Sequence, residues 1–122
     1  MVTARQRYTI RRLGRVYGIV GRVAGRYVAA GYSVELNHPT RYGPIHVVAR
    51  GNGQVLAVDV VYERGRLTVD AARAILEKAK LIRARPILAA YGFRWSDIPE
   101  DVRRFCEENG VKLRAVGELE TG

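Results

Sequence analysis

Hydrophobic positions are most regular between residues 42 and 62, in the stretch YGPIHVVARGNGQVLAVDVVY. The pattern predicts two apolar strands, over 44–50 and 54–62, joined through Gly51, Asn52 and Gly53. An Asn-Gly pair between β-branched runs is one of the strongest short signals for a β-hairpin. His46 and Asp59 interrupt the two strands. A polar side chain on a strand that is buried on both faces needs a hydrogen-bonding partner or a function.

The N-terminal part of the chain has a helical period, from about residue 9 to residue 30. Its apolar face consists of Ile10, Leu13, Tyr17, Val20, Ala24 and Tyr27, and arginines form a separate stripe. A third stripe contains Gly14, Gly18, Gly21 and Gly25. Each glycine costs a helix about 1 kcal/mol relative to alanine, so we expect the stripe to allow close packing of another backbone. Gly31 is placed to end this helix.

The remaining chain alternates between strand and helix patterns. We expect a strand over 32–37 and then a loop over 38–41, because Pro39 lacks the N–H donor of a central strand. Thr68 is suited to cap a helix over 69–83, and a buried strand follows over 85–90. Ser96 or Asp97 should cap a helix that runs to residue 108, before a last strand over 111–116.

The predicted order of elements is α-β-β-β-α-β-α-β, which indicates an α/β fold. Helical crossovers in the second half favour parallel pairing, whereas the first three strands form a meander, so the central sheet should be mixed and flanked by helices. A length of 122 residues suits a single domain over 1–122. We expect an N-terminal arm at 1–8 and a loose tail at 117–122.

The charge balance points to nucleic acid as a partner. The chain has 21 Lys and Arg against 12 Asp and Glu, a net charge of +9 and a pI near 10.3. Such a basic domain, with arginines gathered on one element, has the electrostatic footprint of a nucleic-acid binder. A compositional bias towards arginine, as in thermophiles, is the alternative. The candidate phosphate-binding residues are Arg11, Arg15, Arg22, Arg26, Arg41 and Arg64.

Membrane insertion and disulfide formation are not expected. No apolar run has the length of a membrane span, and the N-terminus lacks the apolar core of a signal peptide, so we expect a cytoplasmic location without membrane contact. Cys106 is the single cysteine and is expected to be a small buried helix residue.

Four segments together resemble the restriction-endonuclease-like PD-(D/E)xK superfamily. They read GYSVELN, RYGPIHVVARGNGQVLAVDVVYERG, LTVDAARAILEKAKLIRARPILAA and RRFCEENGVKL. Within that superfamily, the chain is most similar to YraN-like proteins and to archaeal Holliday-junction resolvases. The resemblance spans about residues 13–116 and implies a nuclease fold that acts on DNA. It also implies a site in which carboxylates hold one or two Mg²⁺ or Mn²⁺ ions and a lysine assists the nucleophile.

The chain departs from the catalytic pattern of the family. The resemblance places His46 where the family has an aspartate, Asp59 where it has a glutamate, and Val61 where it has a lysine. The family's helix acid falls near Gly21, where no carboxylate exists. Asp59 and His46 are thus remnant catalytic positions that would bind metal only in an active enzyme. A cation from elsewhere could replace the missing lysine, and Tyr62 and Glu63 could complete such a site. The candidate cations are Lys78, Lys80 and Arg64.

Three functional hypotheses follow. The first is a catalytically inactive nuclease-fold protein that binds DNA or RNA through phosphates, as a homodimer or as a subunit of a heteromeric nuclease, with no cofactor. The second is an active, metal-dependent endonuclease on branched DNA that uses Asp59 and His46. The third is a structural subunit of an archaeal tRNA-splicing endonuclease, which the segments around Tyr42 and Leu88 fit loosely, although Ala49 stands where that family has its catalytic tyrosine.

Overall fold

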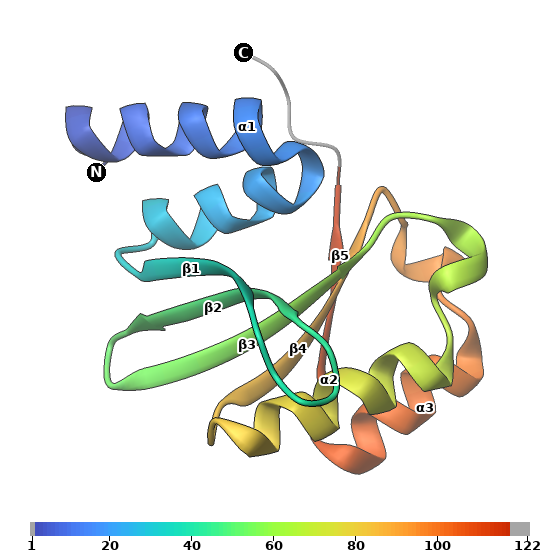
Figure 1. Ribbon diagram of the computed structural model, residues 1–122. Coiled ribbons are helices and arrows are strands. Elements are labelled where there is room, and N and C mark those ends of the chain that lie inside the picture. Colours follow the sequence, from blue (N-terminus) through green and yellow to red (C-terminus); the bar gives the residue numbers. More distant parts are fainter. Residues whose placement is uncertain (1, 118–122) are drawn as a thin grey trace.

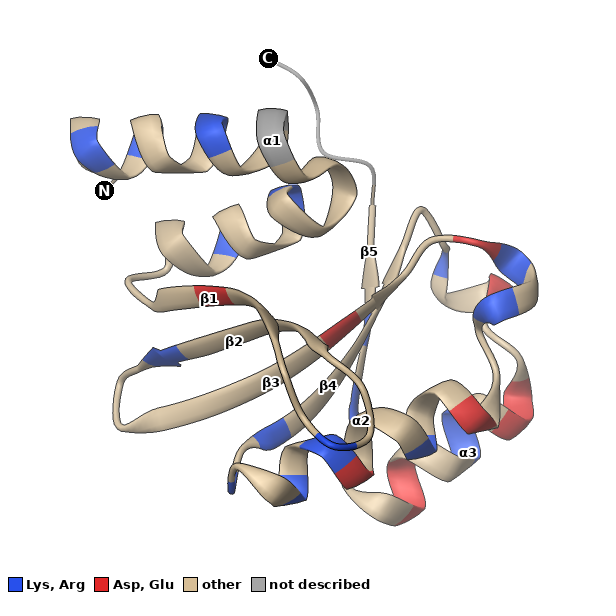
Figure 2. Cartoon of the chain, in the orientation of Figure 1, with Lys and Arg blue, Asp and Glu red and all other residues tan. Residues whose placement is uncertain are grey.

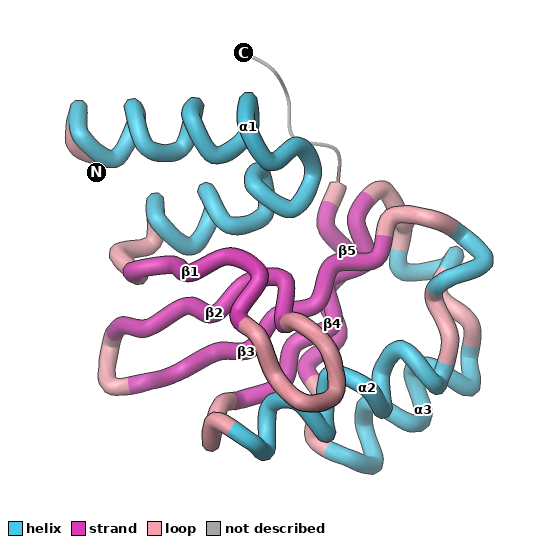
Figure 3. The backbone as a smooth tube through the Cα atoms, in the orientation of Figure 1, coloured by secondary structure: helices cyan, strands magenta, loops and turns pink. Residues whose placement is uncertain are grey.

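The computed structural model describes residues 2–117, apart from the side chains of residues 15 and 16. A mixed sheet of five strands lies at the centre, with one helix on one face and two helices on the other (Figures 1 and 3). The elements are α1 (Ala4–Ala29), β1 (Ser33–His38), β2 (Ile45–Gly51), β3 (Gln54–Val61), η1 (Arg64–Arg66), α2 (Val69–Leu81), β4 (Arg85–Tyr91), η2 (Trp95–Asp97), α3 (Glu100–Asn109) and β5 (Lys112–Val116). This order confirms the predicted α/β class and the mixed, helix-flanked sheet.

The strands lie in the sheet in their order along the chain. β1, β2 and β3 are antiparallel, whereas β3, β4 and β5 are parallel because α2 and α3 form the crossovers between them. Asn52 and Gly53 both have positive φ, 51° and 72°, as a two-residue turn between antiparallel strands requires. The predicted hairpin is therefore confirmed, and Gly51 pairs with Gln54 across it.

The sheet separates two hydrophobic cores. Towards α2 and α3 lie residues such as Val48, Ala57 and Leu88, and towards α1 lie residues such as Val47 and Val58. Successive strand residues point to opposite faces, so the continuous apolar runs of β2 to β4 supply both cores. Asp59 and Lys78 are the buried charged residues among those that the structure describes.

The first helix differs most from expectation. It begins at Ala4, because the Thr3 hydroxyl accepts a hydrogen bond from the Gln6 N–H and the Gln6 side chain accepts one from the Thr3 N–H. Residues 4–8 therefore belong to the helix and not to the predicted arm. At Gly18 the backbone adopts φ 62° and ψ −134°, and α1 folds back on itself there. The prediction of one continuous helix was wrong, because glycine tolerates this conformation and breaks the helical path.

The glycine stripe brings the two halves of α1 together. A methyl group at Gly21 would lie 2.0 Å from the Leu13 carbonyl oxygen, and one at Gly25 would lie 3.0 Å from Cγ2 of Ile10. The Gln6 side-chain amide also donates to the Val28 carbonyl, 3.2 Å away. The expected close packing is confirmed, but its partner is the other half of the same helix. Gly21 and Gly25 are therefore used for packing within the chain.

The third helix also begins later than predicted. Ser96 and Asp97 lie in η2, and α3 starts at Glu100 after Pro99. The Asp97 carboxylate accepts the Arg94 backbone N–H at 3.1 Å, so it caps the short turn before α3 and not α3 itself. The predicted ends of the strands agree with the structure to within one residue. The predicted tail lies outside the described residues from residue 118 onwards.

Candidate functional site

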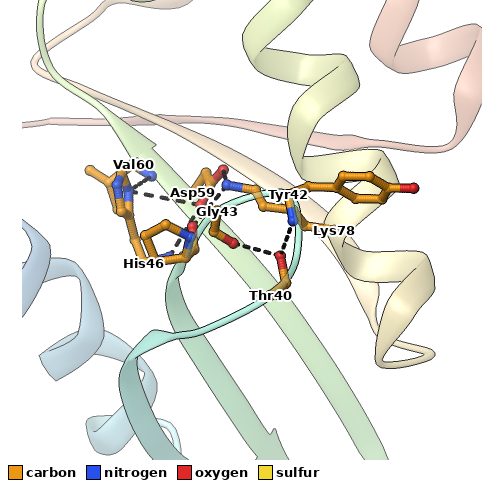
Figure 4. Close-up of polar contacts among 8 residues, drawn as sticks. Thr40, Tyr42, Gly43, His46, Asp59, Val60 and Lys78 are labelled. Carbon is orange, nitrogen blue, oxygen red and sulfur yellow. Dashed lines mark hydrogen bonds and ion pairs between the residues drawn. The ribbon is translucent and has the colours of Figure 1, made fainter.

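Asp59 on β3 and His46 on β2 each accept a backbone N–H of the other strand, at the point where the regular pairing of the two strands ends. The regular β2–β3 pairing ends at Val47 and Val58. Beyond this pair, the His46 N–H donates to Oδ1 of Asp59 at 3.2 Å, and the Val60 N–H donates to Nδ1 of His46 at 2.9 Å (Figure 4). The two polar side chains thus satisfy backbone groups that would otherwise lack partners. This explains why polar residues interrupt both apolar strands.

Lys78 supplies the charge that balances Asp59. Its ammonium lies 2.6 Å from Oδ2 of Asp59, and it also donates to the Pro44 carbonyl at 2.9 Å. The side chains of Lys78 and Asp59 are only 9% and 11% exposed. The ion pair therefore joins β3 to α2 and to the end of the loop between β1 and β2 (Figure 4).

This loop is closed by its own hydrogen bonds. The Thr40 hydroxyl donates to the Gly43 carbonyl at 2.5 Å and accepts the Tyr42 N–H at 3.2 Å. Gly43 has a φ of 107°, a conformation that favours glycine. The turn thus places the Pro44 carbonyl where it accepts a hydrogen bond from the Lys78 ammonium.

The hydrogen bond to Val60 fixes the tautomer of neutral His46. A backbone N–H can only donate, so Nδ1 must be the acceptor and the ring proton lies on Nε2. Nε2 is then a donor and has no lone pair for a metal ion. Nδ1 and Oδ1 of Asp59 are 3.9 Å apart, so the two side chains interact mainly through the backbone.

The described residues do not form the metal site that the family resemblance implies. Both Asp59 oxygens are engaged, since Oδ2 lies in the ion pair with Lys78 and Oδ1 accepts the His46 N–H. Within residues 2–117, no group of three or more His, Cys, Asp or Glu side chains is placed to hold a metal ion. Val61 at the family's lysine position is buried. A divalent cation prefers several oxygen ligands, whereas the Asp59 carboxylate is already engaged by Lys78 and by the His46 N–H.

A hollow of about 290 Å³ lies beside the ion pair. Its lining includes His46, Asp59, Tyr62, Glu63 and Arg66. Tyr62 and Glu63 thus line the same hollow as Asp59, and Glu63 pairs with Arg66 at 4.0 Å. Of the three cations that could replace the missing lysine, Lys78 is the one that pairs with Asp59. Lys80 instead pairs with Glu77 on the exposed side of α2, and Arg64 lines a separate hollow with Ile19 and Tyr91.

The five predicted phosphate-binding arginines whose side chains the structure describes do not line this hollow. Arg11 is exposed on the first half of α1, while Arg22 is half-buried against Gly14. Arg41 stacks over the ring of Tyr42, with 5.1 Å between the guanidinium and the ring centroid. Arg26 lines a different hollow, with Tyr27, Asn52 and Arg114. The side chain of Arg15 lies outside the described residues.

Sequence reasoning did not select three further cations. Arg85, Lys112 and Arg114 lie at the starts of β4 and β5, where they line a hollow of about 530 Å³. The alternation of side chains along a strand could have indicated them. Arg85 points to the same face of β4 as Ile87 and Ala89, and Lys112 points to the same face of β5 as Arg114. Ile87, Ala89 and Val116 belong to the core towards α1, so the alternation along β4 and β5 places Arg85, Lys112 and Arg114 on that face.

No family model, curated protein or solved structure matches this chain. No helix in the described part of the chain is long and apolar enough to cross a membrane.

Proposed function

We propose that this chain is a nucleic-acid-binding protein with a nuclease-like fold that holds its ligand without cleaving it. The observation that carries this proposal is the state of Asp59. Its carboxylate is paired with Lys78 at 2.6 Å and bonded to the His46 N–H at 3.2 Å, so it acts as a structural counter-ion. A nuclease of the family it resembles would use such a carboxylate to hold a metal ion.

The arrangement of the sheet supports the nuclease-like part of the proposal. The resemblance to the PD-(D/E)xK superfamily implies a helix, a three-stranded meander and a crossover helix that leads to a parallel strand. α1, the β1–β3 meander, α2 and β4 follow this order. Asp59 also lies on the third strand, where that family has a metal-binding carboxylate.

The charge of the chain supports nucleic acid as the ligand. A net charge of +9 attracts a polyanion over a long range, and most of the cations are arginines, whose guanidinium groups match phosphate geometry. Contacts to phosphate carry no base information, so binding should depend weakly on sequence.

One observation favours an active endonuclease as the second candidate. Lys78 contacts the β3 carboxylate and could replace the catalytic lysine that is missing at Val61. Against this, the ammonium occupies an oxygen of Asp59 that a metal ion would need.

A combined binding and cleavage experiment tests both candidates. Fluorescently labelled linear and four-way-junction DNA is titrated with the protein at several salt concentrations. The same mixtures are then incubated with Mg²⁺ or Mn²⁺, beside an Asp59→Asn variant kept below its melting temperature. We expect binding that weakens steeply with salt and no cleavage. Salt-independent or undetectable binding would refute the first candidate, and cleavage that Asp59→Asn abolishes would establish the second.

A further inference from the structure

A second basic surface lies apart from the Asp59 site, at the end of the sheet where β4 and β5 begin. Two hollows of about 530 and 440 Å³ adjoin there, since both are lined by Tyr32, Leu56 and Arg114. We call this surface the basic trough. Its polar lining includes Arg26, Tyr32, Asn52, Arg85, Lys112 and Arg114. Lys and Arg positions are visible on α1, at the start of β4 and on β5 in Figure 2.

The topology of the sheet creates this trough. Arg85 pairs in register with Leu56, and Lys112 pairs with Ile87. Leu56 and Ile87 belong to the core towards α1, so Arg85 and Lys112 lie on the same face of the sheet as α1. α1 packs on β1 and β2 and does not extend over the start of β5 (Figure 1). Arg85 and Lys112 therefore lie beyond the part of this face that α1 covers, and Arg114 lies beside Arg26 and Tyr27 of α1.

The cations of the trough have no carboxylate partner among the described residues. Arg26, Arg85, Lys112 and Arg114 form no ion pair there, and Glu107 is the one carboxylate in the described lining. Three exposed arginines elsewhere are paired with carboxylates, at distances of 2.9–3.4 Å. They are Arg73 with Asp70, Arg94 with Asp97 and Arg104 with Glu100. The trough thus carries four cations whose charge no carboxylate among the described residues neutralises.

Two of the arginines are held in place by uncharged groups. Nη1 of Arg85 donates to Oε1 of Gln54 at 3.0 Å, and the Gln54 amide donates to the Tyr32 hydroxyl at 3.4 Å. Burial raises the pKa of Tyr27, and the nearby Arg114 guanidinium opposes that rise. Neutral partners orient these guanidinium groups while leaving their charge available to a ligand.

The geometry points to the sugar-phosphate backbone of a nucleic-acid duplex as the ligand of the basic trough, an inference that rests on the proposed function. The cations suit phosphates, whereas neither aromatic residue in the described lining of the trough, Tyr27 or Tyr32, is exposed for stacking on a base. Tyr27 is buried, and its ring meets that of Tyr32 edge to face at 5.9 Å. The exposed aromatic residues lie elsewhere, at Tyr8, Tyr17, Tyr42, Tyr62 and Trp95. Stacking on aromatic rings is typical of single-strand binding, so a duplex is the better fit.

The test compares two triple variants that lose the same formal charge. Arg85→Gln/Lys112→Gln/Arg114→Gln removes cations from the trough. The matched control, Arg73→Gln/Arg94→Gln/Arg104→Gln, removes the paired arginines. Affinity for a DNA duplex, an RNA duplex and a single strand of the same sequence is measured against salt concentration. Circular dichroism checks that each variant is folded.

We expect the trough variant to bind duplex about tenfold or more weakly, and its salt slope to fall by about 2 to 3, near 0.9 for each phosphate that is no longer neutralised. The control should bind like the wild type. Arg85→Lys/Arg114→Lys keeps the charge and should retain most of the affinity. If the triple trough variant does not fold, Lys112→Glu, at an exposed position, replaces it and should weaken binding in the same direction.

The outcomes separate this inference from the proposed function. If the wild type binds no nucleic acid, the proposed function fails. If the wild type binds but both triple variants weaken equally, or neither weakens, the trough is not the binding surface and the function stands. Tighter binding of the single strand would overturn the assignment to a duplex. The two duplex arms identify DNA or RNA as the source of the backbone.

Discussion

Removing the Lys78 ammonium should destabilise the protein far more than removing any exposed lysine. Lys78→Met keeps most of the apolar stem but leaves Asp59 as a buried carboxylate without its counter-ion. At an effective dielectric constant of about 20, unit charges 2.6 Å apart attract each other by about 6 kcal/mol. The cost of desolvating both groups offsets much of this attraction. When Lys78 alone is removed, the desolvation cost of the buried Asp59 carboxylate remains and no attraction compensates for it.

The expected cost of Lys78→Met is about 3–5 kcal/mol, because both side chains are about nine-tenths buried. For a domain of this size, a loss of 3 kcal/mol corresponds to a fall in Tm of about 10 °C. Asp59→Asn should cost a similar amount, since it leaves the ammonium unpaired. The double variant Asp59→Asn/Lys78→Met should be less destabilised than the sum of the single variants, by about 2–4 kcal/mol.

Urea unfolding followed by circular dichroism measures these free energies, with an unchanged m-value as evidence that the compactness of the two states is preserved. Lys80→Met is the matched control. It removes the same group from the same helix, but at an exposed site that faces Glu77 at 3.4 Å, so it should change stability by less than about 0.5 kcal/mol. Equal effects of Lys78→Met and Lys80→Met, or a coupling energy near zero, would refute the assignment of a buried structural ion pair.

Other predictions concern α1 and Cys106. Gly18→Ala should cost about 1–3 kcal/mol because alanine is strained at φ 62° and ψ −134°; unchanged urea stability would place the turn elsewhere. Gly21→Ala should separate the halves of α1 and speed hydrogen exchange there, because its methyl would lie 2.0 Å from the Leu13 carbonyl oxygen. Gly14→Ala is the control and should leave exchange unchanged, because its methyl meets only the flexible Arg22 side chain at 3.4 Å. Burial raises the pKa of the Cys106 thiol from 9.0 to about 11, so iodoacetamide at pH 8 should label native protein about 100-fold more slowly than urea-unfolded protein. The raised pKa stabilises the fold fully below pH 9, and this contribution should be lost as the pH rises towards 11; native labelling as fast as unfolded labelling would contradict the burial.

The strands and the hairpin could be predicted because their signals are local. Asn52 and Gly53 require positive φ, and the apolar runs on either side leave little choice of pairing. The fold-back at Gly18 could not be predicted in the same way. The apolar period continues on both sides of Gly18, so each half is amphipathic and a straight helix satisfies the pattern equally well. Only the contact between the halves, through Gly21 and Leu13, selects the folded-back form.

The candidate site was predictable in its positions but not in its chemistry. His46 and Asp59 stood out as polar residues on apolar strands, and the structure brings both to one place. The partner of Asp59 depends on how α2 lies across the sheet, which no local pattern specifies. A helical projection nevertheless contains a clue, because Lys78 lies on the same face as Ala72, Ile75 and Ala79, which are all buried. A lysine on a buried face requires an acidic partner.

The position of the basic trough follows from the shape of α1. A helix is about 10 Å across and strands are about 4.8 Å apart, so one helix covers about two strands. The half of α1 after Gly18 packs on β1 and β2. The half before it lies against the second half and farther from β1 (Figure 1).

The opposite face of the sheet has two helices, and there β4 and β5 carry apolar residues such as Leu88 and Leu113. The uncovered start of the α1 face must be polar, but it need not be of one sign. Opposite charges on neighbouring strands stabilise a sheet, and like charges destabilise it. Arg85, Lys112 and Arg114 are nevertheless all cations. Solvation alone does not explain this arrangement, whereas the polyanionic ligand that we propose would explain it.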